Sequence, residues 1–192
     1  NEKEKFSPQS IYAIGKVTAF HACELYKKIF NLKIYGAIFY NHKWRVQGGL
    51  LQDRHDIIEG FPVRQVIIWQ RKGGINFNPG YFLPTYEVIY LIAKPDFKLA
   101  PKANAHGDIW QFTQEMNNPH PAPFPVHLIE RIVSSTEAEV ILDPFMGSGT
   151  TAIAALRHDR KYIGIDVAPE YCEMAEKRIE EEKKQLKIKF TA

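Results

Sequence analysis

The stretch that decides the fold is DPFMGSGTT, residues 143–151, which directly follows the apolar run at 140–142. An apolar run that leads into a glycine turn and then into a helical pattern is typical of a strand that ends at a ligand. Gly147 and Gly149 allow the backbone to bend tightly and to approach a ligand without an intervening Cβ. A helix expected over 150–158 would direct its free N–H groups at that ligand. The sequence therefore predicts a binding turn here.

The pattern around this turn predicts a parallel sheet. An amphipathic helix is expected over 128–133, a short buried strand over 140–142 and a second strand over 162–165. Pro169 would begin a last helix, since proline suits a first helical turn. That helix carries six acidic and six basic side chains between residues 170 and 189, which predicts a solvated face with i,i+4 pairs. Strands that alternate with helices over short connections indicate the α/β class.

The upstream half is less regular. We expect a helix over 16–30, a strand over 34–40, and a helix over 44–59 that Gly48-Gly49 weakens. Runs rich in β-branched and aromatic residues predict strands over 63–69 and 86–92. Residues 95–123 contain five prolines and little periodicity, so we expect a long surface connection there, with 95–119 as a candidate short recognition loop. The length favours a single domain, residues 1–192.

Bulk composition excludes little. The net charge of +3 is compatible with a nucleic-acid partner but does not require one. Cys23 and Cys172 lie far apart and have no metal-binding spacing, which favours a reduced, cytoplasmic protein without a metal. No apolar run is long enough to span a membrane, and no signal-peptide pattern opens the chain.

The strand end at Asp166 indicates what the turn binds. Asp166 closes IGID, 17 residues after Gly149, where a carboxylate can accept hydrogen bonds from ribose hydroxyls. An adenosine-bearing cofactor is therefore expected. Residues 147–152, GSGTTA, also satisfy the G-x-G-x-x-A pattern, so a nicotinamide dinucleotide remains an alternative, as does an ordinary tight turn.

A longer series of motifs narrows the choice. HPAPFP at 120–125, a helix, LDPFMGSGTT at 142–151, a helix and YIGIDV at 162–167 together resemble the cofactor half of the amino-methylating DNA methyltransferases. These enzymes transfer a methyl group from S-adenosylmethionine to adenine N6 or cytosine N4 of DNA. The resemblance is strongest over 106–182 and extends more loosely to residue 34 through GAIFYNHKWR, VIIWQRKGG and YFLPTYEVIYLIAK. It implies a Rossmann-like methyltransferase fold, a mostly parallel twisted sheet with helices on both faces.

The resemblance also implies the cofactor-binding residues. The methionine and ribose end would be lined by Asp143, Phe145, Gly147, Ser148, Gly149 and Thr150. Asp166 would accept the ribose hydroxyls, and Val167 would border the adenine. The opposite wall would comprise Asp108, Trp110, His120, Pro121 and Phe124. Core packing is the alternative for Phe145, and anchoring of a loop is the alternative for Trp110.

The catalytic residues stay unassigned. The family's catalytic peptide is Asp or Ser, two prolines, then Tyr or Phe, and no such tetrapeptide occurs in this sequence. The nearest string, SPQS at 7–10, lacks the aromatic residue that would stack on a flipped base. Only 26 residues follow Asp166, so the catalytic region is expected before the cofactor region, as in the family's β class. We therefore expect a catalytic domain that lacks its N-terminal catalytic-motif region. The alternative is a cofactor- or DNA-binding subunit that is inactive without a second subunit or homodimer partner.

Basic residues between positions 43 and 72 indicate the DNA contact. Lys43, Arg45, Arg71 and Lys72, with Arg64 nearby, could neutralise phosphates of double-stranded DNA. A solvated charged surface is the alternative for each. The resemblance thus predicts a site-specific modification methylase of the restriction–modification type, with adenine N6 favoured over cytosine N4.

Overall fold

The computed structural model describes residues 36–40, 46–47, 50–51, 63–71, 80, 82–83, 85–113, 115 and 124–191. The chain divides into two compact units. Unit 1 comprises Asn1–Trp69 and Tyr86–Phe97, and unit 2 comprises Gln70–Thr85 and Lys98–Ala192. The helix expected over 16–30 lies outside the described residues.

Unit 1 contains a sheet with the strand order β1-β5-β4. The strands are β1 (Gly36–Tyr40), β5 (Tyr86–Ile92) and β4 (Val63–Gln70). β1 and β5 are antiparallel, with Gly36 opposite Ile92 and Tyr40 opposite Val88. β5 supplies a buried cluster of Val88, Tyr90 and Ile92, on which Val63 and Ile68 of β4 pack. All three expected strands are confirmed, because β-branched and aromatic side chains suit a pleated surface.

The helix expected over 44–59 is wrong where the structure describes that segment. β2 (Val46–Gln47) and β3 (Leu50–Leu51) pair antiparallel, with Val46 opposite Leu51 and Gln47 opposite Leu50. The register leaves only Gly48-Gly49 between the strands. Two glycines suit a two-residue hairpin connection, whereas each destabilises a helix interior.

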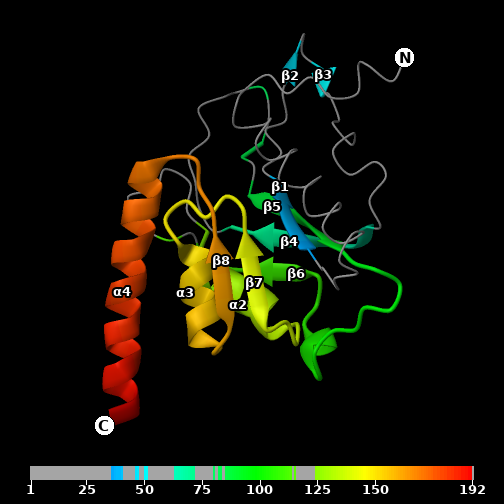
Figure 1. The fold of residues 1–192 in the computed structure, drawn as a ribbon. Helices are drawn as coiled ribbons and strands as arrows, with labels where there is room; N and C mark the ends of the chain where they lie inside the picture. Colours follow the sequence, from blue (N-terminus) through cyan, green and yellow to red (C-terminus); the bar gives the residue numbers. More distant parts are fainter. Residues whose placement is uncertain are drawn as a thin grey trace, which may run out of the picture. The chain divides into compact units, whose positions relative to one another are not determined.

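Unit 2 contains the strand–helix–strand–helix series that the sequence predicts (Figure 1). Its elements are η2 (Ala103–Ala105), β6 (Ile109–Gln111), α2 (Val126–Ser134), β7 (Val140–Asp143), α3 (Thr150–Arg157), β8 (Lys161–Gly164) and α4 (Pro169–Thr191). β7 and β8 are parallel, with Val140 opposite Lys161 and Asp143 opposite Gly164. α4 begins at Pro169, as expected. β7, which leads into the glycine turn, and β8, which follows α3, therefore end at the same edge of their sheet.

The proline-rich segment after residue 95 is more regular than its sequence indicates. It contains η2 and β6, and Ala100 donates its backbone N–H to Ser135 O over 2.9 Å. β6 has only three residues, which is too short to give a recognisable alternation of apolar and polar positions.

Helices α2 and α3 lie behind β7 and β8 in the view of Figure 1. α2 buries Leu128, Ile129 and Val133. On the other face of the strands, Val140, Leu142 and Ile163 are 46%, 45% and 53% exposed. The expectation of a buried strand over 140–142 is therefore wrong for this face, since no helix among the described residues covers it.

Candidate functional site

The turn between β7 and α3 depends on two glycines in the left-handed region. Gly147 has φ 50° and Gly149 has φ 82°, values that side chains with a Cβ rarely adopt. A Cβ on Gly149 would lie 3.0 Å from Ala175 Cβ and 3.2 Å from Ala175 Cα. Gly149 therefore serves both the turn and the close approach of α4.

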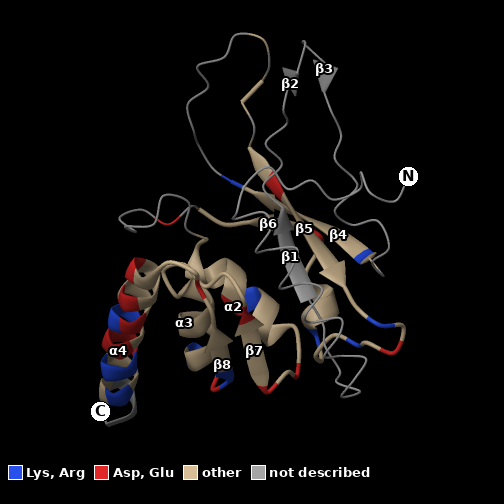
Figure 2. Cartoon of the chain, turned by 45° about the horizontal axis from the view of Figure 1, so that its top comes forward, with Lys and Arg blue, Asp and Glu red and all other residues tan. Residues whose placement is uncertain are grey.

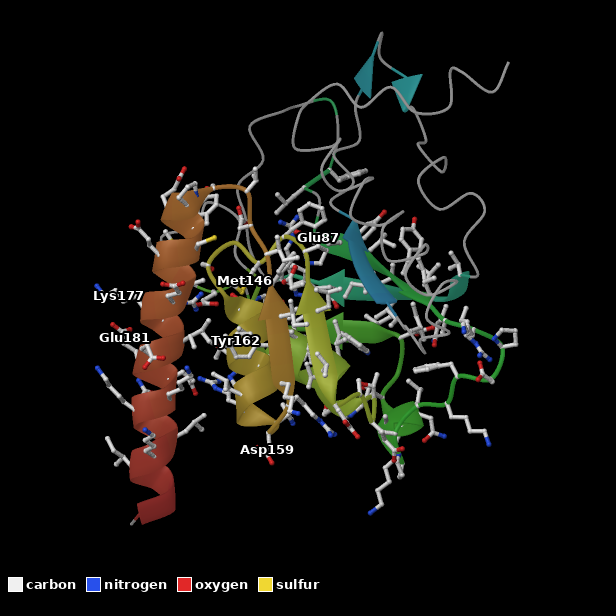
Figure 3. The ribbon with its side chains drawn as sticks, viewed as in Figure 1. Glu87, Met146, Asp159, Tyr162, Lys177 and Glu181 are labelled. Carbon is white, nitrogen blue, oxygen red and sulfur yellow. The ribbon has the colours of Figure 1, made fainter. Side chains whose placement is uncertain are left out.

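Hydrogen bonds tie the turn to the end of β8. Ile165 donates its N–H to Asp143 O, and Met146 donates its N–H to Ile165 O, both over 2.9 Å. The Met146 side chain fills the space over Gly164, where a Cβ would lie 1.8 Å from Met146 Sδ. Met146 and Tyr162 pack on the buried cluster of Ala152, Ala175 and Ile179 (Figure 3). The glycine of IGID thus leaves the space that the Met146 side chain of DPFMGSGTT occupies.

Two carboxylates shape the backbone of the turn. Asp143 accepts the Phe145 N–H at Oδ1 over 3.0 Å and the Thr151 hydroxyl at Oδ2 over 2.5 Å. Asp166 accepts the Gly147 N–H at Oδ2 over 2.9 Å and the Ala168 N–H at Oδ1 over 3.0 Å. Each carboxylate oxygen can accept more than one hydrogen bond. Asp166 can therefore hold the turn and still accept a ribose hydroxyl.

The hydroxyls of Ser148 and Thr150 are engaged by α4. Both residues are 4% exposed. Arg178 Nη1 donates to Ser148 O over 2.7 Å, to Ser148 Oγ over 2.9 Å and to Thr150 Oγ1 over 3.4 Å. Sequence reasoning missed Arg178, because nothing distinguishes it from the other basic residues of a charged helix. Thr151 was missed too, although it stands inside the conspicuous motif.

Trp110, expected on the opposite wall, is buried and anchored. It is 6% exposed, and its indole N–H donates to Gly107 O over 2.6 Å. The Arg131 guanidinium lies 5.5 Å from the centroid of the Trp110 ring and 4.6 Å from that of Phe112. These contacts favour an anchoring role, and its contact with a cofactor stays a prediction. Asp108 beside it is exposed.

Glu115 connects this segment to the turn. Its Oε1 accepts a hydrogen bond from Arg178 Nη2 over 3.0 Å, while the other terminal nitrogen of Arg178 binds Ser148 and Thr150. The structure thus joins the segment that carries Asp108 and Trp110 to the glycine turn through one guanidinium.

The other predicted site residues differ in their burial, and some lie outside the described residues. Val167 is 85% exposed, and Phe124 is half-buried just before α2. Arg71 is half-buried and donates its backbone N–H to Thr85 O over 2.7 Å. The residues outside the described ranges are His120, Pro121, Lys43, Arg45 and Lys72.

Arg64, which lies among the basic residues expected to face DNA, forms hydrogen bonds within unit 1. Its Nη1 donates to Lys94 O over 2.7 Å and to Pro95 O over 3.1 Å. These bonds favour a structural role for Arg64.

A second arginine bridges the helices away from the turn. Arg157 of α3 donates from Nε and Nη2 to the Glu182 carboxylate over 2.7 and 2.9 Å, and from Nη1 to Glu130 over 3.4 Å. The hydrogen bond to Glu182 is the main cause of a raised pKa for Arg157. This network stabilises the packing of α2, α3 and α4 and does not touch the turn.

The described residues offer neither a metal site nor a membrane-spanning helix. They contain no cluster of three or more His, Cys, Asp or Glu side chains that could hold a metal ion. Nor do they contain a helix that is long and apolar enough to cross a membrane.

Comparison with known proteins identifies the family. The model of the N6/N4 methyltransferase family, described as DNA methylase, matches residues 18–177. The chain belongs to this family.

The curated relatives are type II methyltransferases. The chain is 35% identical to M2.DpnII of Streptococcus pneumoniae over 143 residues, 65% of this chain and 53% of that protein. It is 32% identical to M2.MboI of Moraxella bovis over 187 residues, 79% of this chain and 68% of that protein. The chain spans about half the length of the first relatives it matches, 53% of M2.DpnII and 52% of M2.LlaDCHI of Lactococcus lactis subsp. cremoris.

Solved structures agree on the fold. A putative DNA modification methylase from Thermus thermophilus, complexed with S-adenosyl-L-methionine, superposes with a TM-score of 0.55 at 26% identity, covering 92% of this chain and 83% of that one. The M1.HpyAVI–SAM complex superposes with a TM-score of 0.62 at 24% identity, covering 90% and 82%. The predicted Rossmann-like α/β fold is confirmed.

Proposed function

We propose that this chain binds S-adenosylmethionine at the glycine turn and serves the transfer of its methyl group to an exocyclic amino group of a base in double-stranded DNA. Adenine N6 is favoured over cytosine N4. The observation that carries the proposal is the turn itself: two left-handed glycines between parallel strand ends, with Asp166 bonded to the Gly147 N–H, in a member of the DNA methylase family. The relatives support a role as a site-specific modification methylase.

The residues at the turn fit this cofactor. The glycines leave room for close backbone approach, and the first-turn N–H groups of α3 have no acceptor within the helix. Asp166 has lone pairs left for ribose hydroxyls, and the exposed Val167 beside it offers an apolar surface for the adenine. Asp143 and Asp166 add negative charge near a cofactor whose sulfonium is positive. When bound, the cofactor supplies an electrophilic methyl group.

The acceptor side needs groups that this sequence does not reveal. The amino nitrogen of a base is a poor nucleophile, because its lone pair is delocalised into the ring. Hydrogen-bond acceptors and an aromatic platform for a flipped base would make it reactive, yet the family's catalytic tetrapeptide does not occur among the 192 residues. The alternative, a cofactor- or DNA-binding subunit that acts with a second chain, stays a prediction.

Contact with DNA is assigned to basic residues of the upstream half. The proposed phosphate contacts are Lys43, Arg45, Arg71 and Lys72. Each lysine or arginine that neutralises a phosphate makes binding more sensitive to salt. The curated relatives are bacterial proteins, and by analogy we propose a cytoplasmic location for this activity.

The experiment measures cofactor binding and methyl transfer on the same preparation. The chain is titrated with S-adenosylmethionine, then incubated with labelled cofactor and unmodified genomic DNA, and the DNA is digested to nucleosides. A labelled nucleoside supports the methylase and names the target nitrogen. Cofactor binding without transfer supports the subunit role. Binding of NAD in place of S-adenosylmethionine would overturn both.

A further inference from the structure

The guanidinium of Arg178 binds the glycine turn from the side of α4. Arg178 donates to Ser148 O, Ser148 Oγ and Thr150 Oγ1 from one terminal nitrogen and to Glu115 Oε1 from the other. Its side chain is 20% exposed and that of Glu115 is 25% exposed. Hydrogen bonds from a charged donor are stronger than neutral ones, and partial burial limits their competition with water.

The turn needs such support. Residues 147–149 lie outside the helices and strands, and individual hydrogen bonds fix their backbone: the Gly147 N–H binds Asp166 Oδ2 and the Gly149 N–H binds Met146 O, each over 2.9 Å. The left-handed conformations of Gly147 and Gly149 are among many that glycine can adopt, and restricting them costs conformational entropy. A loop that is already ordered binds its ligand more tightly, because that cost does not fall on binding.

We propose that Arg178 is a positioning residue that pre-organises the turn for the cofactor and couples it to the segment carrying Asp108, Trp110 and Glu115. The inference rests on the proposed binding of S-adenosylmethionine at this turn. Arg178 acts from behind, through Ser148 and Thr150, and makes no contact with the cofactor. The hydroxyls of these two residues then serve as acceptors for Arg178.

The chain offers two matched controls. Arg157 also bridges two elements through a carboxylate, Glu182, and is comparably buried, with 31% of its side chain exposed. It stabilises the helices without touching the turn. Lys177 is the neighbouring residue on the exposed side of α4, where Figure 3 shows it directed away from α3.

The test compares Arg178→Ala, Arg178→Lys, Arg157→Ala and Lys177→Ala in the full chain by calorimetric titration with S-adenosylmethionine. We expect Arg178→Ala to weaken binding about tenfold and Arg178→Lys to restore part of that loss, since lysine keeps the charge but not the fork of donors. Arg157→Ala and Lys177→Ala should bind within about twofold of wild type. Amide exchange at residues 147–150, measured relative to the core amides of each variant, should accelerate in Arg178→Ala and not in Arg157→Ala.

Three outcomes overturn the inference: unchanged affinity in Arg178→Ala, equal losses in Arg178→Ala and Arg157→Ala, or no rescue by lysine. If Arg178→Ala fails to fold, Arg178→Lys and Glu115→Gln decide, and wild-type affinity in both would reject the coupling. A wild-type chain that binds no S-adenosylmethionine would instead refute the proposed function, so the two failures are distinguishable.

Discussion

On its inner face, α4 places Ala175, Arg178, Ile179 and Glu182 against the glycine turn and α3. On its outer face, Lys177, Glu180, Glu181 and Lys184 are exposed. Each face carries both acidic and basic residues at helical spacing. Figure 2 shows these residues interleaved along the helix. The sequence of α4 therefore gives little sign of which face carries function.

The two faces of α4 differ in their burial and in the hydrogen-bond partners of their charged side chains. Arg178 bonds to a carbonyl and two hydroxyls of the turn, whereas Lys183 bonds to Glu180 on its own helix. Exposed pairs within one helix contribute little to stability, while partly buried charges that lose a partner are costly. Changes on the inner face should affect stability, and those at residues that contact the turn should also affect binding. Changes on the outer face should affect neither.

The largest effect is expected where the inner face meets the turn. Gly149→Val would force a β-branched residue into the left-handed region and bring its Cβ to 3.0 Å from Ala175 Cβ. We expect a loss of about 3 kcal/mol in unfolding free energy and no measurable cofactor binding. Chemical denaturation and titration would measure both.

Gly107→Val is the matched control for this change. A Cβ at Gly107 has no heavy atom within 4 Å, so its stability should stay within about 0.5 kcal/mol of wild type. Equal losses at the two glycines would refute the role of α4 contact.

Arg157→Ala should reduce stability by about 2–3 kcal/mol, because it leaves the buried Glu182 carboxylate without its bidentate partner. Denaturation in urea measures this loss. Replacement of both Arg157 and Glu182 by alanine should cost less than Arg157→Ala alone. If Arg157→Ala were as stable as wild type, the hydrogen bonds between Arg157 and Glu182 would not stabilise the fold.

Asp166→Ala tests the support of the turn from the side of β8. It removes the acceptor of the Gly147 N–H and the proposed acceptor of the ribose hydroxyls. Cofactor affinity should fall by about 1–3 kcal/mol. Asp159→Ala, in the loop before β8, is a control that should leave affinity unchanged. Wild-type affinity in Asp166→Ala would retire the assignment of Asp166.

The smallest effect belongs to the pair of Glu180 and Lys183, which lies away from the turn. Lys183 lowers the pKa of Glu180, chiefly through their hydrogen bond, so Lys183→Ala should raise that pKa toward its ordinary value. A carboxyl whose pKa is lowered in the folded state stabilises the fold at pH values above its ordinary pKa. This contribution is lost as the pH falls through the lowered pKa. Because both side chains are open to solvent, the melting temperature should not change. An NMR titration follows the carboxyl, and a clear drop in melting temperature would show that this pair matters.

The elements around the turn could be predicted from sequence because their signals are local. Glycines at 147 and 149, a proline at 169 and the apolar stripe of α2 each act over a few residues, and the structure has the turn and helices where these signals place them. The antiparallel pairing of β2 and β3 could not be predicted, because glycines within an otherwise helical pattern indicate a weakened helix as readily as a connection between strands.

The contacts of the site were harder to predict because they depend on tertiary packing. The contact of Ser148 and Thr150 with a cofactor stays a prediction, and their hydroxyls accept hydrogen bonds from a residue 30 and 28 positions away, which local sequence cannot indicate. Local pattern also does not say what covers each face of a strand, so the exposure of Val140 and Leu142 could not be anticipated. Arg178 shares its composition and spacing with its neighbours, and only the position of α4 against the turn singles it out.

The central claim is that the glycine turn binds S-adenosylmethionine. The most direct measurement is calorimetric titration of the full chain with S-adenosylmethionine and, separately, with NAD, each repeated on Gly149→Val. We expect saturable binding of S-adenosylmethionine to the wild-type chain, no binding to the variant, and no binding of NAD to either. Binding of NAD alone, or equal binding of S-adenosylmethionine by both chains, would contradict it.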